Sequence, residues 1–170
     1  MNIAFIGNWS INEGLTYATV IPHLKILSKM PIVNEVVFCT IERGDEIIKK
    51  RDLKIPKINH IPVKSTSQFK SFIGSALNFF SFRNQILNIV IKHESELIIC
   101  RASPAGSIGY YIHKKTRLPF YVESFEPHAD YMLESGVWNW YNPKYLFATY
   151  WERKQKKYAE GLMPVAKNYK

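Results

Sequence analysis

Hydrophobic residues follow two alternating patterns along this chain: short continuous runs, and longer stretches with three- and four-residue spacing. The continuous runs predict buried β-strands at Asn2–Ile6, Val36–Ile41, Ile58–Val63, Leu97–Cys100, Phe120–Glu123 and Gly161–Val165. The spaced stretches between them predict helices over Leu15–Met30, Ser67–Lys92, Ser103–Lys115 and Pro143–Tyr158. Strands and helices therefore alternate from one end of the chain to the other.

Prolines refine the expected helix boundaries. Pro22 is expected either to kink the first helix or to lie near its first turn, because proline lacks the backbone N–H of a helix interior. Ser103 and Asn142 each precede a proline, a pairing typical of a helix N-cap followed by the first helical residue.

The alternation predicts an α/β fold with a doubly wound, Rossmann-like parallel sheet and helices on both of its faces. The handedness of parallel crossovers favours the strand order 3-2-1-4-5-6, with ligands at the carboxyl ends of the strands. All 170 residues are expected to form one domain. In this order Cys39 and Cys100 lie roughly 9–10 Å apart, too far for a disulfide, so we expect two buried free thiols.

The net charge of the chain indicates the kind of binding partner to expect but does not identify it. A formal net charge of +9 favours an anionic partner, such as a phosphorylated substrate or a phospholipid surface. The basic residues are spread along the chain and no nucleic-acid-binding motif is present, so nucleic acid is disfavoured. With no leader-like N-terminus and no apolar run long enough to span a bilayer, we expect a cytoplasmic protein, peripheral to the inner face of the membrane if it meets the membrane at all.

Familiar nucleotide and metal motifs are missing. The loop after the first strand, Gly7–Gly14, does not match the dinucleotide-binding fingerprint, and no P-loop sequence occurs. The five histidines are scattered and no cysteine–histidine spacing suggests zinc, so no metal and no cofactor are expected.

Four segments together carry a family resemblance: Met1–Gly7 with Gly14, Arg101–Gly106, Glu123–Asp130 and Trp151–Arg153. The chain resembles the N-terminal domain of a GT-B glycosyltransferase of the retaining, glycogen-synthase-like family 4. The resemblance implies two Rossmann-like domains across a cleft, the N-terminal one holding a sugar or lipid-linked acceptor and the C-terminal one the nucleotide sugar. The family's donor signature belongs to the second domain and is not in this sequence, so the chain alone should be inactive, as a fragment or as a half-enzyme completed by a partner.

The resemblance also implies which residues form the site. The first loop should contact the acceptor or a donor phosphate through Gly7, Asn8, Trp9, Asn12, Glu13 and Gly14; the alternative is a simple turn with a glycine at positive φ. Arg101 should clamp an anion, with Ser103 beside it, unless it makes a surface ion pair with a neighbouring carboxylate. After strand five, Glu123 should bind the acceptor and either Glu126 or His128 should act on its hydroxyl; the alternative is a loop of solvated charges that includes Asp130.

The carboxyl ends of strands one, four and five should open toward one crevice, so that Gly14, Arg101 and Glu123–Asp130 converge on one ligand. Two aromatic segments have further readings: Phe69–Phe82 is core or a basic interfacial helix, and Trp138, Trp140 and Tyr141 are packing residues or a sugar-stacking surface. A stand-alone ligand-binding module, or another nucleotide-using α/β domain, remains the alternative to a transferase that builds a bacterial polysaccharide.

Overall fold

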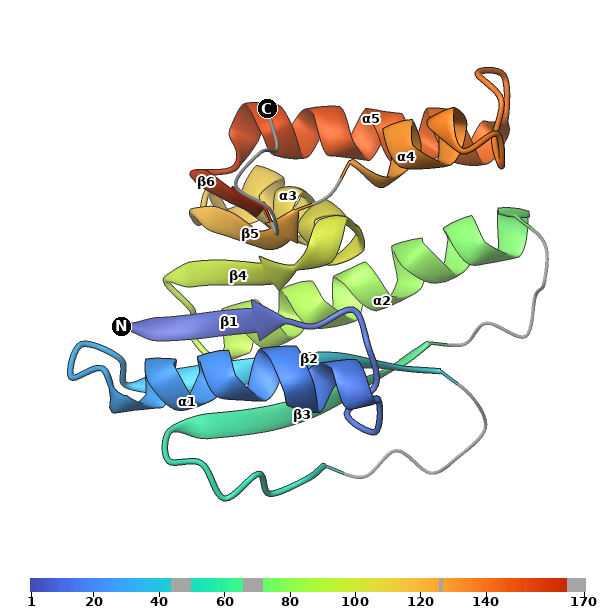
Figure 1. Cartoon of the computed structure of the whole chain (residues 1–170). Coiled ribbons are helices and arrows are strands. Elements are labelled where there is room, and N and C mark those ends of the chain that lie inside the picture. The colour runs from blue at the N-terminus through green and yellow to red at the C-terminus, as the bar shows by residue number, and fades with distance from the viewer. Residues whose placement is uncertain (44–49, 66–71, 126, 165–170) are drawn as a thin grey trace. The chain divides into compact units, whose positions relative to one another are not determined.

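The computed structural model describes residues 1–43, 50–65, 72–125 and 127–164 (Figure 1). The strands are β1 (Asn2–Ile6), β2 (Glu35–Arg43), β3 (Ile58–Ser65), β4 (Leu97–Arg101), β5 (Phe120–Phe125) and β6 (Gly161–Pro164). The helices are the π-helical turn η1 (Thr16–Val20), α1 (Ile21–Lys29), α2 (Phe72–Lys92), α3 (Ala102–Thr116), α4 (His128–Glu134) and α5 (Pro143–Tyr158).

The strands form one six-stranded sheet in the order β3-β2-β1-β4-β5-β6, which confirms the predicted order and the Rossmann-like α/β class. Pairing is parallel, for example between Ile3 of β1 and Val36 of β2. The chain divides into two compact units, Met1–Ile99 and Cys100–Lys170.

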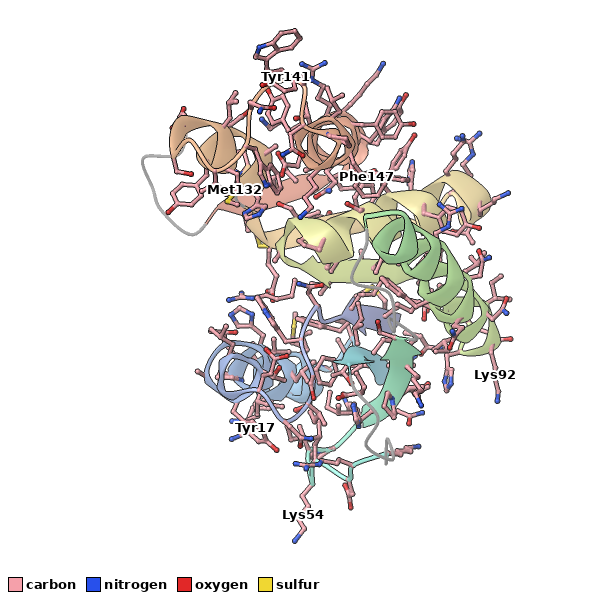
Figure 2. The ribbon with its side chains drawn as sticks, turned by 90° about the vertical axis from the view of Figure 1, so that its right-hand side faces the viewer. Tyr17, Lys54, Lys92, Met132, Tyr141 and Phe147 are labelled. Carbon is pink, nitrogen blue, oxygen red and sulfur yellow. The ribbon has the colours of Figure 1, made fainter. Side chains whose placement is uncertain are left out.

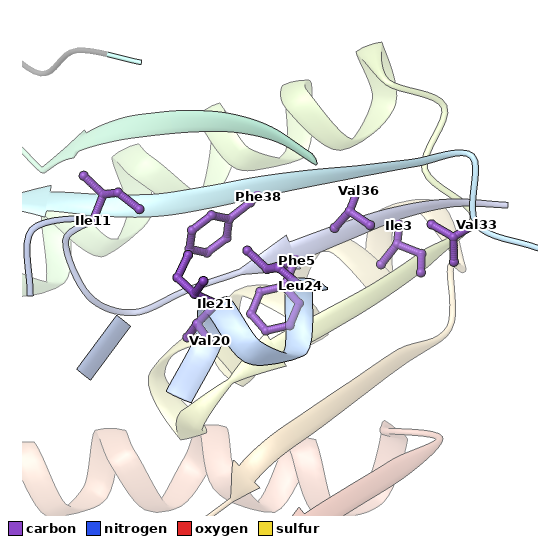
Figure 3. Close-up of a cluster of buried hydrophobic side chains, with 9 residues drawn as sticks. All are labelled: Ile3, Phe5, Ile11, Val20, Ile21, Leu24, Val33, Val36 and Phe38. Carbon is purple, nitrogen blue, oxygen red and sulfur yellow. The ribbon is translucent and has the colours of Figure 1, made fainter. Parts of the chain in front are cut away.

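The core of the first unit lies between α1 and the strands β1 and β2 (Figure 3). Ile3 and Phe5 point from β1 into this cluster, and Val36 and Phe38 point into it from β2, because alternate strand residues share a face. Leu24 of α1 is fully buried against them. In Figure 2, α1 and α2 lie on opposite sides of β1–β3, so both faces of this part of the sheet are covered.

Pro22 occupies the first turn of α1, directly after η1. The backbone N–H of Ile21 donates to the carbonyl of Thr16, five residues earlier. In an α-helix the acceptor would be the carbonyl four residues earlier, so this turn is π-helical. Since Pro22 has no N–H for Ala18, the wider turn adjoins a position where an α-helical bond cannot form. Of the two expected roles of Pro22, the first-turn placement is therefore the observed one.

In the second unit, small residues let α3 pack closely on its neighbours. A Cβ atom added at Gly106 would collide with the Gln155 side chain of α5 and would lie 2.9 Å from Val122 of β5. One added at Gly109 would collide with Cys100 and lie 3.1 Å from Phe120. Both glycines are therefore explained by packing.

Two sequence predictions need correction here, while a third is confirmed. Ser103 is not the N-cap: Arg101 takes that position, and α3 begins at Ala102, two residues before the expected Pro104, with a φ of 66° at Ala102 in the turn out of β4. The segment Glu123–Asp130 is not all loop, because β5 continues to Phe125 and α4 begins at His128. Asn142 does cap α5, its side chain accepting a hydrogen bond from Lys144 N over 2.9 Å.

Cys39 and Cys100 are buried free thiols, as predicted. Burial raises the pKa of Cys39 to about 12 and also raises that of Cys100. Neither thiol is a nucleophile at neutral pH, because the reactive form is the thiolate.

Candidate functional site

The loop after β1, Gly7–Gly14, is fastened to the end of β2 by the carboxylate of Glu42. Ser10 Oγ and Ile11 N both donate hydrogen bonds to it, the second over 3.0 Å. Burial raises the pKa of Glu42, but hydrogen bonds from Ser10, Thr40 and Ile11 outweigh burial, and the pKa is lower than usual. The carboxylate is therefore ionised at neutral pH and holds the loop through charge-assisted hydrogen bonds.

A chain of hydrogen bonds continues from Glu42 to the edge strand β3. Thr40 Oγ1 donates to Glu42 Oε1 over 2.5 Å and lies 2.9 Å from His60 Nε2. Because His60 Nδ1 accepts the backbone N–H of Arg51 over 3.0 Å, the imidazole proton is on Nε2 and points to Thr40. Burial, with the charges of Arg51 and Lys50, lowers the pKa of His60 to about 4 against the opposing effect of Glu42. His60 is therefore neutral at pH 7.

Ser10 is also the centre of bonds within the loop. Its carbonyl accepts Glu13 N over 3.1 Å and Thr16 Oγ1 over 2.7 Å, and its own N–H donates to Glu13 Oε1 over 3.2 Å. Asn12 N donates to Ser10 Oγ over 3.1 Å. These contacts fix the backbone of the loop, so that a ligand would meet a preorganised backbone.

The predicted loop residues differ in accessibility: Asn12 and Gly14 are exposed, Asn8, Trp9 and Glu13 are half-buried, and Gly7 is buried. A Cβ atom at Gly7 would lie 3.1 Å from the Phe38 ring, so packing explains this glycine. At Gly14 a Cβ atom would meet nothing within 4 Å, and the residue has no positive φ. The structure of this unit therefore does not require a glycine at position 14, and the expected turn with a positive-φ glycine is not observed.

In the second unit, Arg101 and Glu123 form an ion pair at the ends of β4 and β5. Nη1 of Arg101 lies 3.3 Å from Oε1 of Glu123, and the side chains are 12% and 9% exposed. Arg101 Nε is buried without a hydrogen-bond partner in the described part of the chain. The arginine does have a carboxylate partner, but the pair is largely buried, not at the surface.

His128 is the exposed first residue of α4, and its ring packs edge-on against Trp138 with centroids 5.4 Å apart. Glu152 of α5 lies beneath this helix end and accepts a hydrogen bond from Ala129 N over 3.1 Å. Burial raises the pKa of Glu152 to about 7, although the N–H of Ala129 lowers it, and Asp130 adds a smaller upward effect. Glu152 therefore exists in both protonation states near neutral pH, directly beneath the backbone that carries His128.

The remaining predicted site residues are less accessible or not described. Ser103 is buried, and its carbonyl accepts hydrogen bonds from Gln155 Nε2 over 2.9 Å and Ser107 Oγ over 3.1 Å. Glu126 lies outside the described residues. Sequence reasoning missed Glu42, because the second strand was expected to end at Ile41, and it gave Glu152 no role of its own, although Glu152 is the one acid in a cationic helix.

Known structures share this fold. The chain superimposes on a protein named as a UDP-N-acetylglucosamine 2-epimerase from Listeria monocytogenes with a TM-score of 0.64, 10% identity and 98% coverage of this chain. For sucrose-phosphate synthase from Thermosynechococcus elongatus the TM-score is 0.63 with 13% identity and 99% coverage. For a UGT transferase from Siraitia grosvenorii, in complex with UDP, these values are 0.53, 11% and 92%. The fold is that of a GT-B domain.

The chain spans 39%, 49% and 42% of the lengths of these three proteins, respectively. No protein-family model and no curated protein sequence matches it. Within the described residues, no three His, Cys, Asp or Glu side chains are grouped to hold a metal ion, and no helix has the length and apolarity to cross a bilayer.

Proposed function

We propose that this chain is the acceptor-side domain of a retaining, nucleotide-sugar-dependent glycosyltransferase of the family 4 type, which transfers a hexose during the synthesis of a bacterial cell-surface polysaccharide. The GT-B fold supports the proposal, and so does its similarity to a UDP-N-acetylglucosamine 2-epimerase, a sucrose-phosphate synthase and a UGT transferase in complex with UDP. A second domain, outside this sequence, would hold most of the nucleotide sugar, and the chain alone would be inactive. The enzyme would work in the cytoplasm on a sugar or a lipid-linked acceptor.

The observation that carries the proposal is the glycine at position 14. It lies where the first loop enters its helix, on an exposed and preorganised segment, yet neither packing nor φ demands a glycine there. A glycine that the fold does not need is explained if a ligand approaches the backbone closely, and N–H groups at a helix start favour an anionic group such as a phosphate. Asn12, also exposed, would contact the same ligand.

The ion pair of Arg101 and Glu123 suits a hydroxyl-rich acceptor. Since Glu123 already balances the charge of Arg101, the pair has less to gain from a second anion than a lone arginine would. At the small exposed part of the pair, the Arg101 guanidinium can donate to a sugar oxygen and the Glu123 carboxylate can accept from a sugar hydroxyl. Ser103 is not proposed to contact the ligand directly, because the residue is buried and its carbonyl already accepts two hydrogen bonds.

His128 is proposed to orient or deprotonate the acceptor hydroxyl, with Glu126 as the alternative group. His128 is exposed, and its backbone is held by Glu152, so the imidazole is presented from a fixed helix end. An imidazole is a suitable general base when it is within hydrogen-bond reach of the hydroxyl.

The experiment measures nucleoside diphosphate release from UDP- and GDP-sugars by the whole protein, with and without a panel of sugar and lipid-linked acceptors. The proposal predicts release that depends on an acceptor and yields a glycoside with retained anomeric configuration. Release without a glycoside, or conversion of a UDP-sugar to its epimer, would contradict it. In calorimetry the 170-residue chain should bind nucleotide sugars weakly or not at all, and submicromolar binding would refute the proposed division between domains.

A further inference from the structure

The surface around α5 combines exposed aromatic residues with cations. Trp140 and Tyr141, just before the helix, are 72% and 63% exposed, and Leu146 and Tyr150 on the helix are 56% and 52% exposed. Tyr141 lies beyond α4 and α5 on the side away from α3 (Figure 2). We call these four residues, together with Arg153, Lys154 and Lys157, the α5 patch.

The helical members of the α5 patch share one face. Leu146, Tyr150, Lys154 and Lys157 follow one another at steps of four, four and three residues, which places them in a row along the helix. Together with Arg153, Tyr145 and Thr149 they line a shallow groove of about 370 Å³. The row is apolar in its first half and cationic in its second.

The charge on α5 is almost entirely positive. The helix carries Lys144, Arg153, Lys154, Lys156 and Lys157 and a single acid. That acid, Glu152, is buried on the α4 side, and burial raises its pKa to about 7. The exposed face of the helix therefore presents cations without a compensating carboxylate.

Two lysines of the α5 patch lie against tyrosine rings, one ring inside the patch and the other, Tyr158, next to it. Lys154 Nζ is 5.3 Å from the ring centroid of Tyr150, and Lys157 Nζ is 5.4 Å from that of Tyr158. The contact with Tyr150 keeps the Lys154 ammonium group at the level of this ring, where it can meet head groups while the ring enters the interface.

We propose that the α5 patch binds the surface of a bilayer that contains anionic phospholipids. The patch offers Trp and Tyr side chains, which favour the boundary between head groups and acyl chains, and a row of cations that matches a negative surface. The same combination is characteristic of helices that lie in the membrane interface. The inference deepens the proposed function by giving the domain a place on the membrane where a lipid-linked acceptor would be, yet vesicle binding can be measured without any transfer reaction.

The α5 patch is not the phenylalanine-rich segment Phe69–Phe82, for which the sequence offered a membrane-interfacial helix as one of two interpretations. The side chains of that segment are not described before Phe82, and Phe82 is buried with 9% exposure. For the α5 patch, by contrast, the structure describes both the exposed aromatic side chains and the cations beside them.

The test is cosedimentation with vesicles of phosphatidylcholine alone, or of phosphatidylcholine mixed with phosphatidylglycerol. The proposal predicts binding to the mixed vesicles only, weakened when salt rises from about 0.1 M to about 1 M, which shortens the Debye length from ~10 Å to ~3 Å. The variant K154E/K157E should lower the apparent partition coefficient at least about tenfold, and W140A/Y141A should lower it by a similar factor.

Two matched variants serve as controls. K114E/K115E makes the same charge change at the exposed end of α3, and I26A/I91A removes two side chains that are 61% and 59% exposed elsewhere. Both should retain most of the binding, and thermal melts should show all four variants folded. Absence of binding at low salt, equal binding to both kinds of vesicle, or equal losses in patch and control variants would overturn the proposal.

Discussion

The carboxylate of Glu42, near the end of β2, accepts the backbone N–H of Ile11 over 3.0 Å, so a residue 31 positions away fixes the shape of the loop after β1. Because the carboxylate is buried and ionised, the loop is held by bonds stronger than those between neutral groups. The segment proposed to meet a ligand is therefore part of the rigid framework of its unit.

Replacing Glu42 with glutamine should weaken this framework. An amide offers one acceptor oxygen and presents an NH₂ group to donors, so the free energy of unfolding should fall by about 1.5–3 kcal/mol. The measurement is urea denaturation, with Glu134→Gln, on an exposed position, as the control that should change by less than about 0.5 kcal/mol. Equal stabilities of the two variants would show that the Glu42 bonds do not hold the loop.

His60 should make the protein less stable in mild acid. Its pKa is lowered to about 4, so between about pH 6.5 and pH 4 the unfolded state binds a proton that the folded state does not. Stability should therefore fall as pH falls through this window, by on the order of 2–3 kcal/mol from His60. His60→Gln cannot titrate and should flatten the pH dependence; an unchanged slope would contradict the neutral, buried histidine.

Glu152 should make the protein less stable as pH rises, the opposite of the effect of His60. Its pKa is raised to about 7, so its contribution to stability is complete below about pH 4.5 and is lost as pH rises through 7. Glu152→Gln resembles the protonated form and should gain stability relative to the parent between pH 5 and pH 8, by on the order of 2 kcal/mol. A difference that stays constant with pH would show that Glu152 does not titrate in this range.

The sequence was sufficient to predict the six strands and their order, because continuous apolar runs such as Asn2–Ile6 have few alternatives to a buried strand. The predicted start of α3 is two residues too late, because the left-handed backbone of Ala102 is not a preference that the sequence reveals. α4 was missed because it is short and its first turn is capped by Glu152, more than twenty residues away in the chain.

The candidate site was predicted in part. Arg101 and Glu123, proposed separately, do form a pair, because β4 and β5 end at the same edge of the sheet. The roles of the site residues remain predictions. The carboxylate that fastens the loop to β2 belongs to Glu42, whose loop partners Ser10 and Ile11 lie 32 and 31 residues away, so no local motif marks it.

Catalysis by the β5–α4 segment is testable in the whole protein. Placed separately, Glu126→Gln and His128→Ala should identify the group that acts on the acceptor hydroxyl, since its removal should lower kcat by roughly 10²–10⁴. The measurement is kcat at saturating donor and acceptor, with thermal melts as the folding control. If both variants stay folded and within about threefold of the parent, or about 0.65 kcal/mol in barrier, neither residue is catalytic.

The most direct measurement uses Gly14→Ala in the whole protein, with stability and the kcat/KM for the nucleotide sugar measured on the same preparation. Because an added Cβ meets nothing within 4 Å and φ is not positive, the melting temperature should be unchanged or raised, as expected for alanine in place of glycine at a helix start. If a ligand approaches this backbone, kcat/KM should fall at least about tenfold, or about 1.4 kcal/mol. An enzyme that is equally stable and within about threefold of the parent activity would contradict the assignment of this loop to the substrate.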